Sequence, residues 1–172
     1  VIPEGSSRTI ALETGEIDIN TSVLASDYSR VKDNEDLGLY ENTANQLYGL
    51  FFNETKEPFN NPDFRRAVEY AVDKEAVIQA SQEGLGERMT SILPSLVVGS
   101  IDAGYTYDVD KAKEYLEKSG YVQPEGQKFT ISTMGDLNTK MAVVIQANLA
   151  DIGIDVEVSQ STVASHMEQC GQ

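Results

Sequence analysis

Hydrophobic and polar residues follow two different periods toward the end of the chain. Residues 129–133 and 154–158 alternate apolar and polar side chains, which is typical of half-buried strands. Between them, apolar side chains recur at three- and four-residue steps and predict a helix that ends at Gly153. Those side chains belong to Met141, Val144, Ile145, Leu149 and Ile152. A strand, a helix and a strand at this spacing predict a βαβ unit with parallel strands and a right-handed crossover.

Other helices are predicted from their start signals. Asn61 followed by Pro62 is typical of a helix start, because the Asn side chain caps the helix and Pro suits its first position. Asp73 and Asp108 predict two more starts, each followed by an apolar face. Gly120 is expected to end the last of these helices.

The N-terminal part of the chain predicts smaller elements. Ser6 or Ser7 is expected to cap a helix over residues 8–14. Residues 16–20 alternate in polarity and predict a short strand, and a short helix is expected near residues 25–31.

Two segments between these elements are unusual. Residues 46–53 are rich in aromatic side chains and nearly all apolar, which predicts a strand buried on both faces. Residues 84–107 predict an irregular loop, and a loop of this length is more often functional than accidental. The fold class is therefore predicted as α/β, or as α+β if the aromatic strand pairs antiparallel.

Composition excludes some partners. The chain has 172 residues and a net charge of −15, and 40% of its residues are hydrophobic, as in a folded globular protein. Such an acidic chain is not expected to bind nucleic acid or anionic lipid, which both require clustered Lys and Arg. Its single cysteine, Cys170, rules out an internal disulfide and a cysteine-based zinc site. The ends of the sequence read as those of a piece taken from a longer chain.

No catalytic or metal-binding pattern emerges. His166 is the only histidine, and its neighbour Ser165 would not face it on a helix, so His166 is expected to be a surface or packing residue. The Asp and Glu clusters match no calcium-loop spacing. The sequence therefore predicts a protein that is not an enzyme and that holds no cofactor and no metal.

Four segments carry a family resemblance. Residues 8–18 resemble a pattern "R…AL.sGeiD", and residues 53–75 resemble "fN…PFnd.rvRqAl.yAiDke". Residues 107–121 are similar to "YdpeKAkelL.eaGy", and residues 146–157 to "iq..L..iGi.v.". In this order and spacing, the segments resemble the extracytoplasmic solute-binding proteins of family 5, which include oligopeptide-, dipeptide- and nickel-binding proteins.

The resemblance implies a fold, a function and partners. It implies that residues 1–172 form most of one lobe of a two-lobed protein with a type II periplasmic-binding-protein-like fold, a mixed sheet flanked by helices. The lobes would close over a small solute, most often an oligopeptide or dipeptide, and deliver it to ABC transporter permease subunits. The whole protein would lie outside the cytoplasm, in the periplasm or as a lipoprotein that touches the membrane only through its anchor. A ligand-sensing domain of a transcription regulator is the alternative function.

Ligand contacts are expected in loops at the strand ends, where open α/β sheets bind ligands. Met134, Asp136 and Asn138 follow the strand at residues 129–133 and open the next helix. In the family, the position of Asn138 is often polar or basic and close to the ligand, and an N-cap role is the alternative for this residue. The resemblance also makes Arg88 and Thr162 candidate contacts, although many relatives have an aromatic residue where Thr162 stands.

Overall fold

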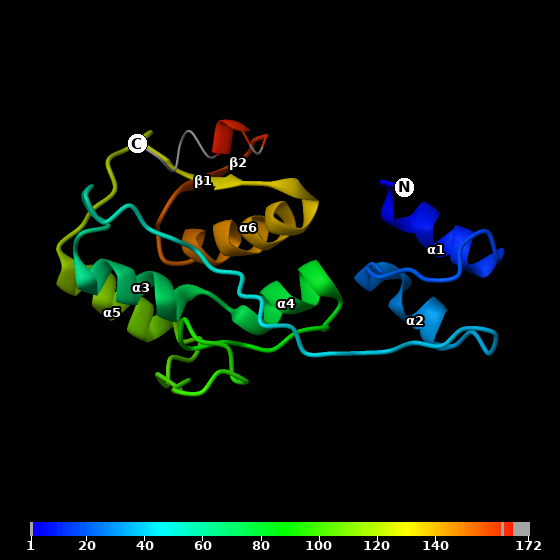
Figure 1. Cartoon of the computed structure of the whole chain (residues 1–172). Helices are drawn as coiled ribbons and strands as arrows, with labels where there is room; N and C mark the ends of the chain where they lie inside the picture. Colours follow the sequence, from blue (N-terminus) through cyan, green and yellow to red (C-terminus); the bar gives the residue numbers. More distant parts are fainter. Residues whose placement is uncertain (1, 163, 167–172) are drawn as a thin grey trace. The chain divides into compact units, whose positions relative to one another are not determined.

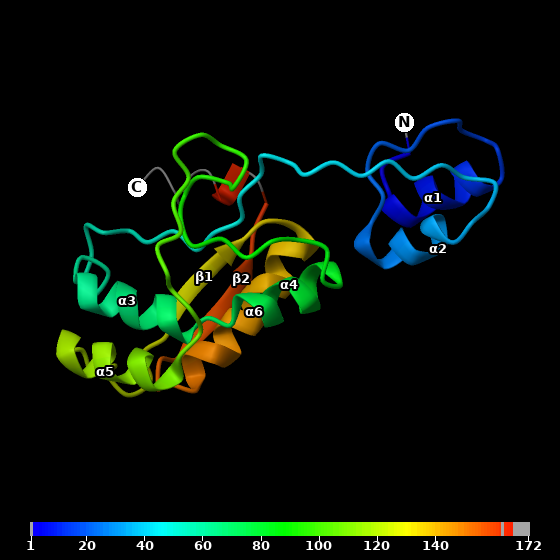
Figure 2. The same ribbon diagram turned by 90° about the horizontal axis from the view of Figure 1, so that it is seen from below.

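The computed structural model describes residues 2–162 and 164–166, and these divide into two compact units between residues 44 and 45, called unit 1 and unit 2. Figures 1 and 2 show the elements of both. Each unit is described by itself. His166 falls within the described residues, whereas Cys170 lies outside them.

Unit 1 is a small helical unit that contains α1 (Gly5–Glu13), the 3-10 turn η1 (Ala25–Asp27) and α2 (Tyr28–Lys32). The buried Thr9 hydroxyl donates to the Asp27 carboxylate over 2.9 Å. Arg30 forms an ion pair with Glu13, whose nearest atoms lie 2.9 Å apart. The expected short helix near residues 25–31 is therefore confirmed, and polar contacts join it to α1.

Two expectations for unit 1 are wrong. The cap of α1 is Glu4, whose carboxylate accepts the Ser6 and Ser7 amides, so neither serine is the cap. No strand forms over residues 16–20 in the described structure. After Gly15, the amides of Glu16 and Ile17 both donate to the Ala11 carbonyl at the end of α1, over 2.8 and 3.2 Å. Because these amides close the helix, they are not available to a sheet ladder.

Unit 2 holds the predicted βαβ unit. β1 (Phe129–Thr133) and β2 (Val156–Gln160) pair in parallel, from Phe129 opposite Val156 to Thr133 opposite Gln160, and α6 (Gly135–Ala150) connects them. β2 begins two residues later than residue 154, where the alternation starts, because the Ile154 amide still donates to Leu149 at the end of α6. The described residues form only this parallel two-stranded sheet, so the prediction of a mixed sheet is wrong for them.

Three more helices pack in unit 2: α3 (Pro62–Ala71), α4 (Lys74–Gln82) and α5 (Val109–Ser119). Asn61, Asp73 and Asp108 cap them through their side chains, as predicted. α3 packs along α5, and α4 packs along α6 (Figure 2). Gly120 ends α5 with a φ of 68°, a conformation that is least costly for glycine.

The core of unit 2 centres on Phe64, whose side chain is fully buried on α3. Its ring meets those of Tyr121 and Phe129 edge to face, with centroids 5.2 and 6.0 Å away. The ring of Phe59 lies 5.8 Å from Phe64 and 5.0 Å from Phe129. These aromatic contacts join α3 to β1 and to the segment after α5, so the helices and the sheet share one core.

The predicted strand at residues 46–53 does not form in the described structure. Leu50 and Phe52 do pack against the core, whereas the Phe51 side chain between them is 77% exposed. The segment therefore buries one face and not two. No strand pairs with it among the described residues, and an extended segment without a paired ladder is not a sheet strand.

Asn61 is expected to contribute more than a helix cap. Its Oδ1 accepts the Asp63 amide over 2.9 Å, and its Nδ2 donates to the Ser119 carbonyl at the end of α5 over 3.1 Å. We expect Asn61→Ala to lower the free energy of unfolding by about 1–2 kcal/mol, because both bonds are lost. Asn61→Asp keeps the cap and loses only the donor, so its urea-unfolding midpoint should lie between those of Asn61→Ala and the unaltered chain. Equal midpoints for all three would contradict this role.

Candidate functional site

The carboxyl ends of β1 and β2 meet at one edge of unit 2 and carry a cluster of hydroxyl groups. We call this region the carboxyl edge, and it comprises residues 132–139, 160–162 and 164–166. The Ser132 hydroxyl lies 3.3 Å from the Ser161 hydroxyl and 3.1 Å from Nδ1 of His166. The Thr133 hydroxyl lies 2.9 Å from that of Thr139. Parallel pairing puts these groups side by side because both strands end at this edge.

The N-terminus of α6 opens at the carboxyl edge. Its N-cap is Met134, which makes no capping bond through its side chain, and Gly135 has a φ of 73°. The first backbone amides of a helix point outward and carry a partial positive charge, which suits a carboxylate or a carbonyl group of a ligand. Asp136 lies in the first turn, where its carboxylate accepts a hydrogen bond from Nε2 of the Gln160 side chain over 3.3 Å.

Asn138 lies at the same edge. It is the fourth residue of α6 and is half-buried, so the alternative in which it caps this helix is wrong. Thr162 is exposed, and its hydroxyl accepts the Ser165 amide over 3.3 Å at the turn formed by residues 164–166. The structure thus brings Met134, Asp136, Asn138 and Thr162 to one edge of the sheet. Whether each of them contacts a ligand stays a prediction.

His166 is half-buried against Ser132, which agrees with its expected packing role. Its sequence neighbour Ser165 gives no hint of this contact, because Ser132 lies 34 positions earlier in the chain. The alternation of residues 129–133 could have shown which face Ser132 occupies, but only the structure shows that residue 166 returns to it.

Arg88 lies elsewhere in unit 2, in the loop of residues 84–107. Its guanidinium donates to the Tyr105 carbonyl over 2.9 Å and lies 3.7 Å from the Glu75 carboxylate. In Figure 1 this loop is at the lower side of unit 2, below α3 and α4, whereas the carboxyl edge is on the upper side. The structure therefore does not bring Arg88 together with the other candidates.

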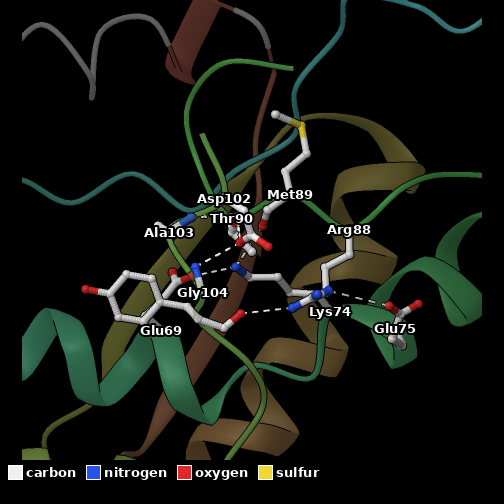
Figure 3. Close-up of polar contacts among 10 residues, drawn as sticks. Glu69, Lys74, Glu75, Arg88, Met89, Thr90, Asp102, Ala103 and Gly104 are labelled. Carbon is white, nitrogen blue, oxygen red and sulfur yellow. Dashed lines mark hydrogen bonds and ion pairs between the residues drawn. The ribbon is translucent and has the colours of Figure 1, made fainter. Parts of the chain in front are cut away.

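An open cleft of about 250 Å³ lies beside Arg88, between the start of α4 and the loop. At its wall Lys74 forms an ion pair with Glu69 and donates to the Met89 carbonyl over 2.9 Å (Figure 3). Further along the loop, hydrogen bonds from the Thr90 hydroxyl and the Gly104 amide lower the pKa of Asp102 below its ordinary value. No sequence pattern predicts this polar network, because its members are ordinary helix and loop residues that only folding brings together.

The described residues contain neither a metal-holding cluster nor a membrane-spanning helix. Within them, no group of three or more His, Cys, Asp or Glu side chains is arranged to hold a metal ion. No helix in this part of the chain is long and apolar enough to cross a membrane.

Comparison with known proteins shows the family to which the chain belongs. The family model described as "Bacterial extracellular solute-binding proteins, family 5 Middle" matches residues 1–169. Heme-binding protein A of Haemophilus influenzae is 31% identical over 90% of this chain, and the nickel-binding periplasmic protein of Escherichia coli is 30% identical over 92%. The match covers 29% and 34% of those two proteins, so the chain spans about a third of their length.

A solved structure agrees with the sequence matches. The periplasmic binding protein DppA of Helicobacter pylori, in complex with the peptide STSA, superimposes with a TM-score of 0.79 at 31% identity. The superposition covers 99% of this chain and 33% of that protein. The fold expected from the resemblance is thus confirmed as that of part of a periplasmic binding protein.

Proposed function

Because the chain belongs to the bacterial extracellular solute-binding proteins of family 5, which are not enzymes, we propose that it is part of the substrate-binding component of an ABC importer. In this proposal residues 1–172 belong to one lobe of a longer, two-lobed protein, and that whole protein captures a peptide outside the cytoplasm. Its permease subunits are the partners that receive the peptide. The match over residues 1–169 is the observation that carries the proposal.

The chemistry of the carboxyl edge supports a peptide as the solute. A peptide backbone presents amide donors, carbonyl acceptors and, at its end, a carboxylate. The edge offers hydroxyls that both donate and accept, the side-chain amides of Asn138 and Gln160, and the positive end of α6. The H. pylori relative bound to a tetrapeptide is among the proteins that this chain resembles over nearly its whole length.

In this proposal the protein captures the solute by closing two walls around it. The carboxyl edge forms one wall, and the part of the whole protein outside residues 1–172 supplies the other. A solute that contacts both walls binds the closed state better than the open state, and this difference shifts the protein toward closure.

The choice of solute is tested by thermal unfolding of the whole protein with the peptide STSA, heme or Ni²⁺ added separately. A ligand raises the unfolding temperature only if it binds the folded state, and the rise grows with its concentration above Kd. We expect the peptide to raise the unfolding temperature and the other two to leave it unchanged. If heme or Ni²⁺ raised the unfolding temperature and the peptide did not, the solute would be that ligand and not a peptide.

Asn138→Ala is expected to weaken peptide binding by the whole protein about tenfold, because one hydrogen bond of roughly 1.4 kcal/mol is lost. Calorimetric titration measures the affinity. Lys140→Ala is the matched control, since Lys140 is exposed on α6 two residues further on and is expected to leave the affinity unchanged. Unaltered affinity in Asn138→Ala would remove this residue from the site.

A further inference from the structure

Within the loop of residues 84–107, residues 90–103 form a closed loop, which we call the Ω-loop. The Thr90 hydroxyl donates to the Asp102 carboxylate over 2.6 Å, and the Ala103 amide donates back to the Thr90 hydroxyl over 3.1 Å (Figure 3). Just outside this pair, Arg88 donates to the Tyr105 carbonyl over 2.9 Å. The two ends of the loop are therefore tied to each other, as is typical of Ω-loops.

The base of the Ω-loop is also tied to the helices. Lys74 joins the Met89 carbonyl to Glu69 of α3, and Arg88 approaches Glu75 of α4. Within the loop, the Ser100 hydroxyl donates to the Leu93 carbonyl over 2.9 Å. These bonds pair polar groups of the loop with one another and with α3 and α4. They fix the conformation of the loop without a buried apolar core.

The outward surface of the Ω-loop is aliphatic. The exposed fractions are 73% for Ile92, 60% for Leu96, 100% for Val98 and 70% for Ile101. No charged residue occurs from Met89 to Ile101, although 24% of the whole chain is charged. Large aliphatic side chains held in water add no stability to unit 2, and a concentration of them in one short uncharged loop is typical of a surface that another part of a protein covers.

We propose that this aliphatic surface packs against the part of the whole protein that lies outside residues 1–172. This inference rests on the proposed function, in which the chain is one portion of a longer binding protein. Relatives that match nearly all of this chain are about three times as long, since the match covers 29% to 34% of them. An uncharged surface suits a contact within one protein, where no long-range charge steering is needed and burial of apolar area stabilises the pair.

The Ω-loop and the carboxyl edge share no residue. In Figure 1 the Ω-loop lies low on unit 2 and the carboxyl edge lies high, although Figure 2 shows both toward the same end of the unit. The interface proposed here is therefore made of other residues than the wall that meets the peptide.

Cysteine labelling of the whole protein tests the proposal. With every native cysteine, Cys170 included, replaced by serine, Val98→Cys is compared with Lys113→Cys at an exposed position on α5. We expect a maleimide reagent to label position 98 at least about tenfold more slowly than position 113 in the folded protein, because burial leaves only brief openings for reaction. The two positions should react at the same rate in denaturant.

Three other outcomes would contradict the proposal. Equal rates in the folded protein would mean that the Ω-loop stays exposed. Protection that is lost on roughly hundredfold dilution would assign the surface to a second copy. Protection that requires added peptide STSA would show that the surface is exposed in the peptide-free protein and so does not form a standing contact with the rest of the protein. If position 98 is protected but the protein fails to bind peptide, the interface stands and the proposed function fails.

Discussion

Phe64→Ala is expected to lower the free energy of unfolding of the chain by about 3–5 kcal/mol. The Phe64 side chain is 1% exposed and contacts the rings of Phe59, Tyr121 and Phe129, so its removal leaves a cavity where α3, β1 and the segment after α5 meet. Because native domains have only about 5–15 kcal/mol of stability, this variant should unfold at a much lower urea concentration, as followed by circular dichroism.

Phe51→Ala is the matched control, since it removes the same side chain from a position that is 77% exposed. We expect it to change the free energy of unfolding by less than about 0.5 kcal/mol. If Phe51→Ala instead destabilises the chain as strongly as Phe64→Ala, the aromatic segment is buried on both faces, as its sequence alone predicts. The pair of variants therefore distinguishes the core seen in the structure from the one that the hydrophobic pattern suggests.

Local signals in the sequence predict the helices of unit 2 well. Asn61, Asp73 and Asp108 cap α3, α4 and α5 because each side chain reaches an amide two or three residues ahead. Gly120 ends α5 for an equally local reason. The βαβ unit is confirmed as well, because strand alternation and helical periodicity are both properties of short segments.

The two incorrect strands show where such reasoning stops. Alternation over residues 16–20 and apolar content over residues 46–53 describe the side chains, whereas a strand also needs a neighbour for its backbone. Amides that follow Gly15 bond back to α1, and residues 46–53 meet no paired strand among those described. The position of a pairing partner is a long-range property that the segment itself does not encode.

In the candidate site, too, features that depend on neighbouring residues could be predicted and features that depend on distant residues could not. The carboxyl edge could be predicted because Met134 and Asn138 follow directly on a strand. The contact between Ser132 and His166 could not, because it joins residues 34 positions apart. The resemblance makes Arg88 a candidate ligand contact, whereas in the structure its guanidinium donates a hydrogen bond within its own loop. The sequence does mark the surface of the Ω-loop, because its uncharged stretch from Met89 to Ile101 is unusual in an acidic chain.

The largest effect on binding is expected from separating the chain from the rest of the protein. Residues 1–172 alone should bind the peptide STSA at least about hundredfold more weakly than the whole protein, because the carboxyl edge supplies one wall and closure cannot add the contacts of the other. Calorimetric titration of both forms measures the difference, with circular dichroism to verify that the isolated chain is folded. The Asn138→Ala exchange in the whole protein serves as the internal comparison, since the loss of one contact should weaken binding less than the loss of a whole wall. Micromolar or tighter binding by residues 1–172 alone would show that the carboxyl edge is a complete site, and the two-walled mechanism would then be wrong.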